Sequence, residues 1–315
     1  MSDSPRETER QQTFDAGPTV GVVGVGAIGD PIARRIAGSF ETVAFDIDDE
    51  RLAAIAEAGV EAASGTAELG RRSDIVLLSL PAGDAVEAAV LGAEGVLAEL
   101  SEHDVLVDTS TIDPETTETV AAACEERGVE FLDSPVSGGP RNAKKGALTA
   151  MVGGDEAILD VVRPVIESFS ETIYHVGERG TGIAMKLANN YMLAVNSAVV
   201  CEALLVARRA GIDDETFFAV ASRASGDSYA LRRNVEGFVL PGEYDSEADL
   251  SIVHKDVSLA ERFAHDLDVP LLAGGATSSI YQLAEDRGLS DRDFAALLAL
   301  YDRSEDVGAT EGTQP

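Results

Sequence analysis

A glycine-rich turn between the first apolar segment and the first helical segment most constrains the fold of this chain. Residues 19–23 form a short apolar run, and they are followed directly by Gly24-Val25-Gly26-Ala27-Ile28-Gly29. The first glycine permits a tight turn, the second lets the backbone approach a pyrophosphate, and the third allows a helix to pack closely on a strand. N–H groups at the start of that helix can bind phosphate oxygens. This order of strand, turn and helix predicts a Rossmann-type unit that binds a dinucleotide.

The first half of the chain continues as alternating strand-like and helical segments. Apolar runs typical of buried strands occur at 42–45, 74–80, 105–108, 130–132 and 148–152. Buried strands separated by helices imply a mostly parallel sheet that is covered on both faces. We therefore predict an α/β, doubly wound N-terminal domain.

The pattern changes after Gly182. Residues 183–210 contain no glycine or proline and are apolar on nearly every face, which predicts one long buried helix that joins two domains. Further helical segments are predicted at 213–224, 228–238, 251–267, 275–287 and 290–302, so the second domain is expected to be all-α. The expected organisation is a disordered leader at 1–17, an NAD-binding domain at 18–181, an all-α substrate and oligomerisation domain at 182–303, and a tail at 304–315.

The charge of the chain limits its partners. A net charge of −32 opposes binding to nucleic acid or to an acidic membrane surface. The carboxylates are scattered along the chain, and of 24 cationic residues only Lys144, Lys145, Lys186 and Lys255 are lysines. This composition resembles that of haloarchaeal proteins, and we expect a halophilic protein.

The N-terminus has no apolar run of the kind found in signal peptides, and the uncharged run 187–201 is too short to span a bilayer, so we expect a cytoplasmic protein. Cys124 and Cys201 both lie in apolar stretches, where reduced core thiols are expected. No cluster of His, Cys and carboxylate residues has the spacing of metal ligands, so no metal site is predicted.

Asp46 ends the second predicted strand, 20 residues after Gly26. An acidic residue there can bind the ribose hydroxyls of the adenosine and would repel a 2′-phosphate. NAD is therefore the preferred cofactor, with NADP possible. The alternative interpretation is that Asp46 only begins the acidic turn 46–50.

The segment from Phe131 to Gly139 leads from a strand into a proline and then into Ser137, Gly138 and Gly139. Backbone N–H groups at the two glycines and the serine hydroxyl could converge on an anion such as a substrate carboxylate. A structural turn between two strands is the alternative.

Three polar residues complete the candidate site. Lys186 and Asn190 lie four residues apart, on one face of the long predicted helix. Lysine can exchange a proton with a substrate oxygen, which arginine cannot do at any working pH. Asn190 could hold the substrate, and Lys255 in His254-Lys255-Asp256 could close over the cofactor from the second domain. The alternatives are a helix-packing ion pair for Lys186 and an exposed surface pair for Lys255.

Five collinear motifs carry a resemblance to a known family: residues 24–33, 106–116, 133–154, 180–190 and 254–260. They are similar to the successive signatures of the β-hydroxyacid dehydrogenases, which include 3-hydroxyisobutyrate dehydrogenase and tartronate semialdehyde (2-hydroxy-3-oxopropionate) reductase. The resemblance extends over about residues 19 to 303.

The resemblance implies an NAD(P)-dependent oxidoreductase of small 3-hydroxy acids, with Lys186 as the catalytic acid and base. It places substrate on Ser137, Gly138, Gly139 and Asn190. It places the cofactor on Gly24, Gly26, Ala27, Ile28 and Gly29, and on Leu80, Pro81, Thr111 and Lys255. It also implies a homodimer or homotetramer.

Alternatives within the same architecture stay open, namely a sugar-acid dehydrogenase of the 6-phosphogluconate type and an imine reductase. A phosphorylated sugar acid would need a cationic cluster, for which Arg232-Arg233 is the candidate. A non-catalytic dinucleotide-binding scaffold is the alternative of another class. Ala248, Asn142 and Ala147 depart from residues common in the family, so they bear on the identity of the substrate.

Overall fold

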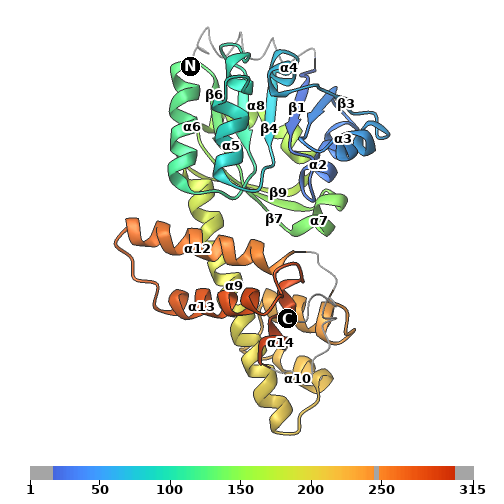
Figure 1. The fold of residues 1–315 in the computed structure, drawn as a ribbon, viewed down its shortest axis with the longest axis vertical. Helices are drawn as coiled ribbons and strands as arrows, with labels where there is room; N and C mark the ends of the chain where they lie inside the picture. The colour runs from blue at the N-terminus through green and yellow to red at the C-terminus, as the bar shows by residue number, and fades with distance from the viewer. Residues whose placement is uncertain (1–16, 245–247, 302–315) are drawn as a thin grey trace, which may run out of the picture. The chain divides into compact units, whose positions relative to one another are not determined.

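The computed structural model describes residues 17–244 and 248–301, and the chain divides into two compact units, Met1–Lys186 and Leu187–Pro315 (Figure 1). The predicted leader, apart from Gly17, and the predicted tail lie outside the described residues.

The first unit contains a nine-stranded sheet. Six strands run parallel in the order β3-β2-β1-β4-β5-β6, as expected for a doubly wound fold. They are β1 (Val20–Val23), β2 (Thr42–Phe45), β3 (Glu61–Ala62), β4 (Ile75–Leu78), β5 (Val105–Asp108) and β6 (Glu130–Asp133). β8 (Leu148–Gly153) pairs antiparallel with β6 and with β7 (Val136–Ser137), and parallel with β9 (Ser170–Gly177). The sequence pattern missed β3, β7 and β9.

Helices cover both faces of this sheet. Side chains of successive strand residues point to opposite faces, so one strand can contribute residues to two apolar cores. Val22 and Leu77 belong to one apolar core, while their neighbours Val23 and Val76 belong to the other. The first core includes residues of α2 (Gly29–Ile36), α3 (Asp49–Ala56) and α8 (Glu156–Glu167). The second includes residues of α4 (Thr66–Arg71), α5 (Gly83–Leu91), η1 (Val96–Ala98) and α6 (Pro114–Glu126), and α5 and α6 lie side by side (Figure 1).

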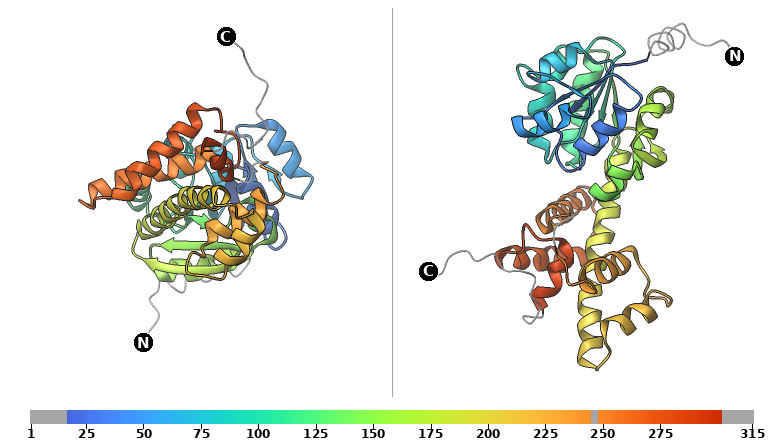
Figure 2. Two further views of the ribbon diagram at one scale, coloured as in Figure 1. Left: turned by 90° about the horizontal axis from the view of Figure 1, so that it is seen from below. Right: turned by 90° about the vertical axis from the view of Figure 1, so that its right-hand side faces the viewer.

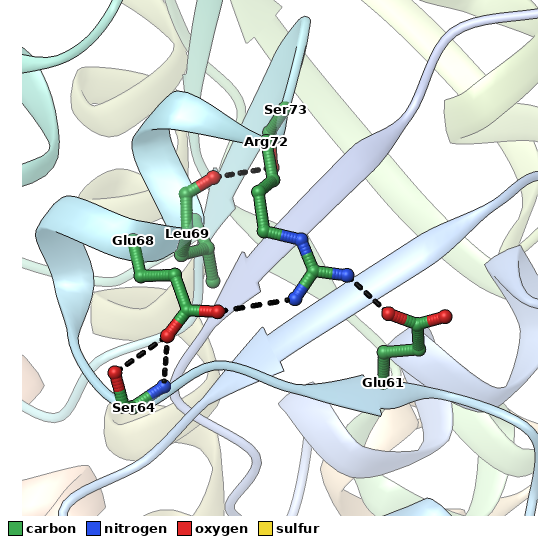
Figure 3. Close-up of polar contacts among 6 residues, drawn as sticks. All are labelled: Glu61, Ser64, Glu68, Leu69, Arg72 and Ser73. Carbon is green, nitrogen blue, oxygen red and sulfur yellow. Dashed lines mark hydrogen bonds and ion pairs between the residues drawn. The ribbon is translucent and has the colours of Figure 1, made fainter.

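A polar network holds the short edge strand β3 against the start and end of α4 (Figure 3). The backbone N–H and the hydroxyl of Ser64 donate to the carboxylate of Glu68 at 2.9 and 2.5 Å. Arg72 donates to Glu68 at 3.3 Å and also pairs with Glu61 of β3. Both residues of β3 are exposed, so no apolar sequence pattern predicted this strand.

The second unit is all-helical, as predicted, and begins within the long helix α9 (Thr181–Arg209). The other elements are α10 (Asp214–Ala221), α11 (Tyr229–Leu231), η2 (Arg232–Val239), α12 (Leu250–Asp266), α13 (Leu272–Asp286), η3 (Phe294–Leu297) and α14 (Leu298–Tyr301). α12 and α13 pack side by side (Figure 2).

Two of the predicted helical segments of this unit contain helices other than α-helices. Most of 228–238 is the π-helix η2, and 290–302 contains the 3-10 helix η3 followed by the single turn α14. An ion pair joins the two regions: Arg233 donates two hydrogen bonds to Asp293, at 2.8 and 2.7 Å. Asp293 also accepts the backbone N–H of Ala295 at 2.9 Å and so caps η3.

Among the described residues, α9 is the one helix long and apolar enough to cross a membrane by length and composition. Within the structure, 44% of its most apolar window is buried. A helix at the core of a soluble protein has the same length and composition, so this property is weak evidence for a membrane.

Candidate active site

Five of the segments predicted to bind the cofactor and substrate follow strands of the parallel part of the sheet. Gly24 follows β1, Asp46 follows β2, Leu80 follows β4, Thr111 follows β5 and Ser137 follows β6. Because these strands are parallel, their carboxyl ends lie at one edge of the sheet. The strand order reverses between β1 and β4, and ligands of open α/β sheets bind at such a switch point.

The glycine-rich loop has the geometry that a dinucleotide requires. A Cβ atom on Gly24 would lie 2.4 Å from the carbonyl oxygen of Ser79, and one on Gly29 would lie 1.9 Å from that of Gly24. These two glycines are therefore required by the packing of α2 against the strands. A Cβ on Gly26 would meet an Arg51 nitrogen at 3.6 Å and nothing else within 4 Å. The loop thus leaves space at Gly26, where a pyrophosphate would approach the backbone.

Asp46 is 8% exposed and holds this loop against the end of β2. One carboxylate oxygen accepts the backbone N–H of Val25 at 2.8 Å, and the other accepts that of Asp48 at 3.0 Å. A guanidinium nitrogen of Arg51 lies 3.9 Å from the first oxygen. Asp46 therefore lies in the turn after β2 and bonds to the glycine-rich loop, and these contacts do not decide between the two interpretations.

The loops after β4 and β5 are joined to each other. The backbone N–H of Leu80 donates to the hydroxyl of Ser110 at 3.0 Å, and the hydroxyl of Thr109 donates to the carbonyl of Leu78 at 2.6 Å. Pro81 is exposed and Thr111 is half-buried. These contacts place Leu80, Pro81 and Thr111 on neighbouring loops at the carboxyl edge of the sheet.

The substrate loop predicted at 137–139 continues from β7 into α7 (Gly139–Lys145). Ser137 is half-buried and pairs with Thr149 of β8. Gly138 and Gly139 have φ values of +133° and +69°, which L side chains rarely adopt. A Cβ on Gly138 would lie 3.0 Å from the Cβ of Asn142. Asn142, one of the departures from the family pattern, thus lies directly beside this loop.

Lys186 and Asn190 occur on α9, one turn apart, and each is 8% exposed. Asn190 donates to a carboxylate oxygen of Asp256 at 2.5 Å and accepts from the amide of Asn189 at 3.1 Å. Lys255 is one third exposed, and its ammonium lies 3.1 Å from the other oxygen of Asp256. The structure thus brings Asn190 and Lys255 together on Asp256, a buried residue that the sequence reasoning had not included in the site.

Two further acidic residues, Asp108 and Asp133, were also missed. They end the neighbouring strands β5 and β6, where they are paired in register, and they are 3% and 2% exposed. Burial raises the pKa of Asp108 to about 6, with a smaller contribution from the charge of Asp133. Burial also raises the pKa of Asp133, against the opposing effect of backbone hydrogen bonds. For each residue, the sequence signal that could have identified it was an aspartate at the end of an apolar strand.

The arginine pair considered for a phosphate group is engaged elsewhere. Arg233 is held by Asp293 and lies over the rings of Phe294 and Phe238, at 3.9 and 4.5 Å from their centroids. Arg232 donates at 2.8 Å to Asp227. Both guanidinium groups therefore already have carboxylate partners.

The described residues contain no group of three or more His, Cys, Asp and Glu that could hold a metal ion. Both cysteines are buried and neither forms a disulfide, and burial raises the pKa of the Cys124 thiol to about 12. Cys124 therefore stays a protonated core thiol at neutral pH.

Comparison with known families shows matches over nearly all described residues. Residues 19–177 match the NAD binding domain of 6-phosphogluconate dehydrogenase, and residues 180–301 match the NAD-binding family of NADP-dependent 3-hydroxyisobutyrate dehydrogenase. The 2-(hydroxymethyl)glutarate dehydrogenase of Eubacterium barkeri is 33% identical, over 93% of this chain and 98% of the relative. The NAD-dependent L-serine dehydrogenase of Pseudomonas aeruginosa is 31% identical, over 90% of this chain and 97% of the relative.

Solved structures give the same result. The 3-hydroxyisobutyrate dehydrogenase of Mycobacterium tuberculosis with L-serine is 28% identical, with a TM-score of 0.84 over 91% of this chain and 99% of that one. Psf3 in complex with NADP+ is 26% identical, with a TM-score of 0.82 over 90% of this chain and 100% of that one. The chain belongs to the β-hydroxyacid dehydrogenase family. It is an NAD(P)-dependent oxidoreductase that acts on a CH–OH group.

Asp108 generates a prediction about stability and pH. Its pKa is about 6 in the folded chain and near 4 when unfolded, so its contribution to stability is present below pH 4 and is lost as pH rises through 6. Asp108→Asn keeps an oxygen to accept the Ser110 N–H but cannot ionise. Between pH 4 and pH 8, the free energy of unfolding of Asp108→Asn should therefore rise by roughly 3 kcal/mol relative to that of the unaltered chain.

Denaturant unfolding across this pH range measures the effect. Asp160→Asn, which alters an exposed carboxylate on α8, is the matched control and should leave the pH profile unchanged. Parallel pH profiles for Asp108→Asn and the unaltered chain would contradict the prediction.

Proposed function

We propose that this chain oxidises a small 3-hydroxy acid to the corresponding aldehyde acid with NAD, and that Lys186 is the general base in this direction and the general acid in reverse. The observation that carries the proposal is the burial of Lys186. It is 8% exposed, whereas Lys144 and Lys145 are exposed. Lysine is among the residue types least often buried in proteins. A buried amine four residues from a buried amide fits a site that binds and deprotonates an alcohol.

In the proposed reaction, some residues bind the substrate and cofactor, and Lys186 transfers the proton. NAD supplies the acceptor for the hydride that leaves the carbinol carbon. The amine of Lys186 removes the hydroxyl proton as the alcohol becomes a carbonyl, and it returns the proton in the reverse direction. Backbone N–H groups at Gly138 and Gly139 and the hydroxyl of Ser137 hold the substrate carboxylate. The Gly24–Gly29 loop, Leu80, Pro81 and Thr111 hold the cofactor.

Asn190 and Lys255 have supporting roles in this proposal. The carboxylate of Asp256 receives a hydrogen bond from Asn190, so the amide oxygen and nitrogen of Asn190 have a defined orientation. Asn190 would then present a fixed polar group to the substrate. Lys255 would bind the cofactor, and its ion pair with Asp256 restrains the ammonium.

The names of the relatives support the substrate class. 2-(Hydroxymethyl)glutarate, L-serine and 3-hydroxyisobutyrate share a primary alcohol on the carbon next to the one that bears the carboxylate. A 3-hydroxy acid of this kind presents one alcohol and one carboxylate at a fixed spacing. Phosphorylated sugar acids fit less well, because Arg232 and Arg233 already pair with carboxylates.

A substrate panel tests the class directly. NADH formation is followed with 3-hydroxyisobutyrate, 3-hydroxypropionate, glycerate, L-serine, 2-(hydroxymethyl)glutarate and 6-phosphogluconate, each in dilute buffer and in molar KCl. We expect the highest kcat/KM with a 3-hydroxy acid that lacks phosphate. Preference for 6-phosphogluconate, or no turnover of any member although NAD binds, would contradict the proposal.

Lys186→Ala should lower kcat by roughly 10²- to 10⁴-fold, because only the proton acceptor is removed. The affinity for NAD, measured by titration, should stay within a few-fold of the original. Lys144→Ala removes an exposed lysine and serves as the control. Turnover unchanged in Lys186→Ala would remove Lys186 from the mechanism.

Asp46 is proposed to set the preference for NAD. Asp46→Asn removes the charge but keeps an acceptor for the loop, whereas Asp46→Ala removes both. If charge repulsion excludes the 2′-phosphate, both variants should narrow the ratio of kcat/KM for NAD over NADP. A ratio that moves in neither variant would leave Asp46 with its structural contacts alone.

The exposed side of α9 supports a homo-oligomer. Met192, Val199 and Val206 recur at seven-residue intervals on α9 and are 52%, 54% and 72% exposed. Such a row of apolar side chains on one face is typical of a surface that another helix covers. We propose a homodimer or homotetramer in which a second copy covers this row. Val206→Glu should then lower the mass measured by light scattering toward that of one chain, and an unchanged multimer would contradict this arrangement.

The amino-acid composition supports adaptation of the protein to a cytoplasm with a high salt concentration. The excess of carboxylates lies throughout the chain, and screening by salt would reduce their mutual repulsion. The two salt conditions of the substrate panel therefore also test the halophilic proposal, which requires higher activity in molar KCl.

A further inference from the structure

The carboxylate of Asp133 joins the end of β6 to the start of α9. One of its oxygens accepts the backbone N–H of Gly180 at 2.8 Å, and the other accepts that of Ile183 at 2.8 Å. Asp133 is 2% exposed. Both donors lie at the N-terminus of α9, where backbone N–H groups have no partner within the helix and where negative charge is favoured.

The backbone around this carboxylate is packed too closely to shift. A Cβ atom on Gly182 would lie 2.5 Å from the carbonyl oxygens of both Asp133 and Met151. One on Gly153 would lie 2.6 Å from a carboxylate oxygen of Asp133 and 2.7 Å from the N–H nitrogen of Gly182. These two glycine-sized spaces would not tolerate a displaced first turn of α9, so the helix start has one position relative to β6 and β8.

This position determines where Lys186 lies. Ile183, which donates to Asp133, precedes Lys186 by three residues, or roughly 4.5 Å along the helix axis. In the other direction along the chain, Asp133 precedes Ser137 by four residues. The same carboxylate is therefore close in sequence to the substrate loop and bonded to the helix that carries the proposed base.

We propose that Asp133 is a positioning residue for the reaction: by fixing the first turn of α9 on the end of β6, it sets the position of Lys186 relative to the loop 137–139. This inference rests on the proposed role of Lys186. Asp133 exchanges no proton with the substrate, since both its oxygens are directed at backbone donors. Misplacement of a reacting group by about 1 Å can lower a rate roughly 100-fold, so the effect of Asp133 on turnover should be large.

Asp133→Ala and Asp133→Asn test the proposal. The substrate is the hydroxy acid of the panel with the highest kcat/KM, unlabelled and with deuterium on its carbinol carbon. Asp133→Ala should lower kcat by about 100-fold. Asp133→Asn should fall between Ala and Asp, because an amide oxygen can still accept one of the two N–H groups. In both variants the deuterium isotope effect on kcat should rise, because hydride transfer slows relative to product release.

Asp155→Ala is the matched control. Asp155 caps α8 in the same unit by accepting the N–H of Ala157 at 2.8 Å, and it takes no part in the proposed site. It should lower the melting temperature without changing kcat or the isotope effect. A merely structural role for Asp133 predicts the same behaviour for its variants: reduced stability, with kcat per folded molecule and the isotope effect unchanged. That result would overturn the proposal.

The outcomes also separate this inference from the proposed function. If Lys186→Ala is inactive and folded Asp133→Asn has the original kcat, the positioning role alone fails. If Lys186→Ala keeps its turnover, the proposed function fails first. NAD affinity within a few-fold of the original in the Asp133 variants would show that the cofactor loop is intact, and a large loss of NAD affinity that accounts for the fall in kcat would also overturn the inference.

Discussion

The parallel arrangement of six strands in a sheet with helices on both faces is the constraint on which the rest of the structure depends. Parallel strands need crossover connections, and here helices supply most of them, covering each face with apolar side chains. All carboxyl ends consequently lie at one edge, where each chain segment leaves the sheet. The glycine loop, Asp46 and the loops after β4, β5 and β6 are close together for this reason, although they are spread over more than a hundred residues of sequence.

Polar groups at this edge are buried because strand ends are covered by the loops that follow them. Asp46, Asp108 and Asp133 each end or directly follow a strand, and each accepts backbone N–H groups. A buried carboxylate is tolerable when its oxygens are hydrogen-bonded, and the bonds then fix the donor segments. In this way the same residue type holds the cofactor loop through Asp46 and the start of α9 through Asp133. In the proposed reaction, the positions of Lys186 and of the glycine-rich loop follow from these structural carboxylates.

The conformational requirements of single positions could be predicted from the sequence, whereas contacts between residues far apart in the chain could not. The Gly24–Gly29 loop was predictable because positive φ and close backbone approach restrict single positions to glycine. Lys186 was selected as a candidate because lysine is rare in this chain. Asp133 was missed because its donors lie 47 and 50 residues away, and Asp256 because its partner Asn190 lies 66 residues away. A helix was predicted at η2, whereas the contact of its Arg233 with Asp293, 60 residues away, was not predictable from local pattern.

Pre-steady-state formation of NADH tests the central claim most directly, since it isolates hydride and proton transfer from product release. NAD-loaded protein is mixed rapidly with the preferred 3-hydroxy acid, and the first turnover is compared in the unaltered chain and in Lys186→Ala. We expect rapid NADH formation in the unaltered chain and none on the same timescale in the variant, with both ligands bound. Equal first-turnover rates in the two proteins would contradict it.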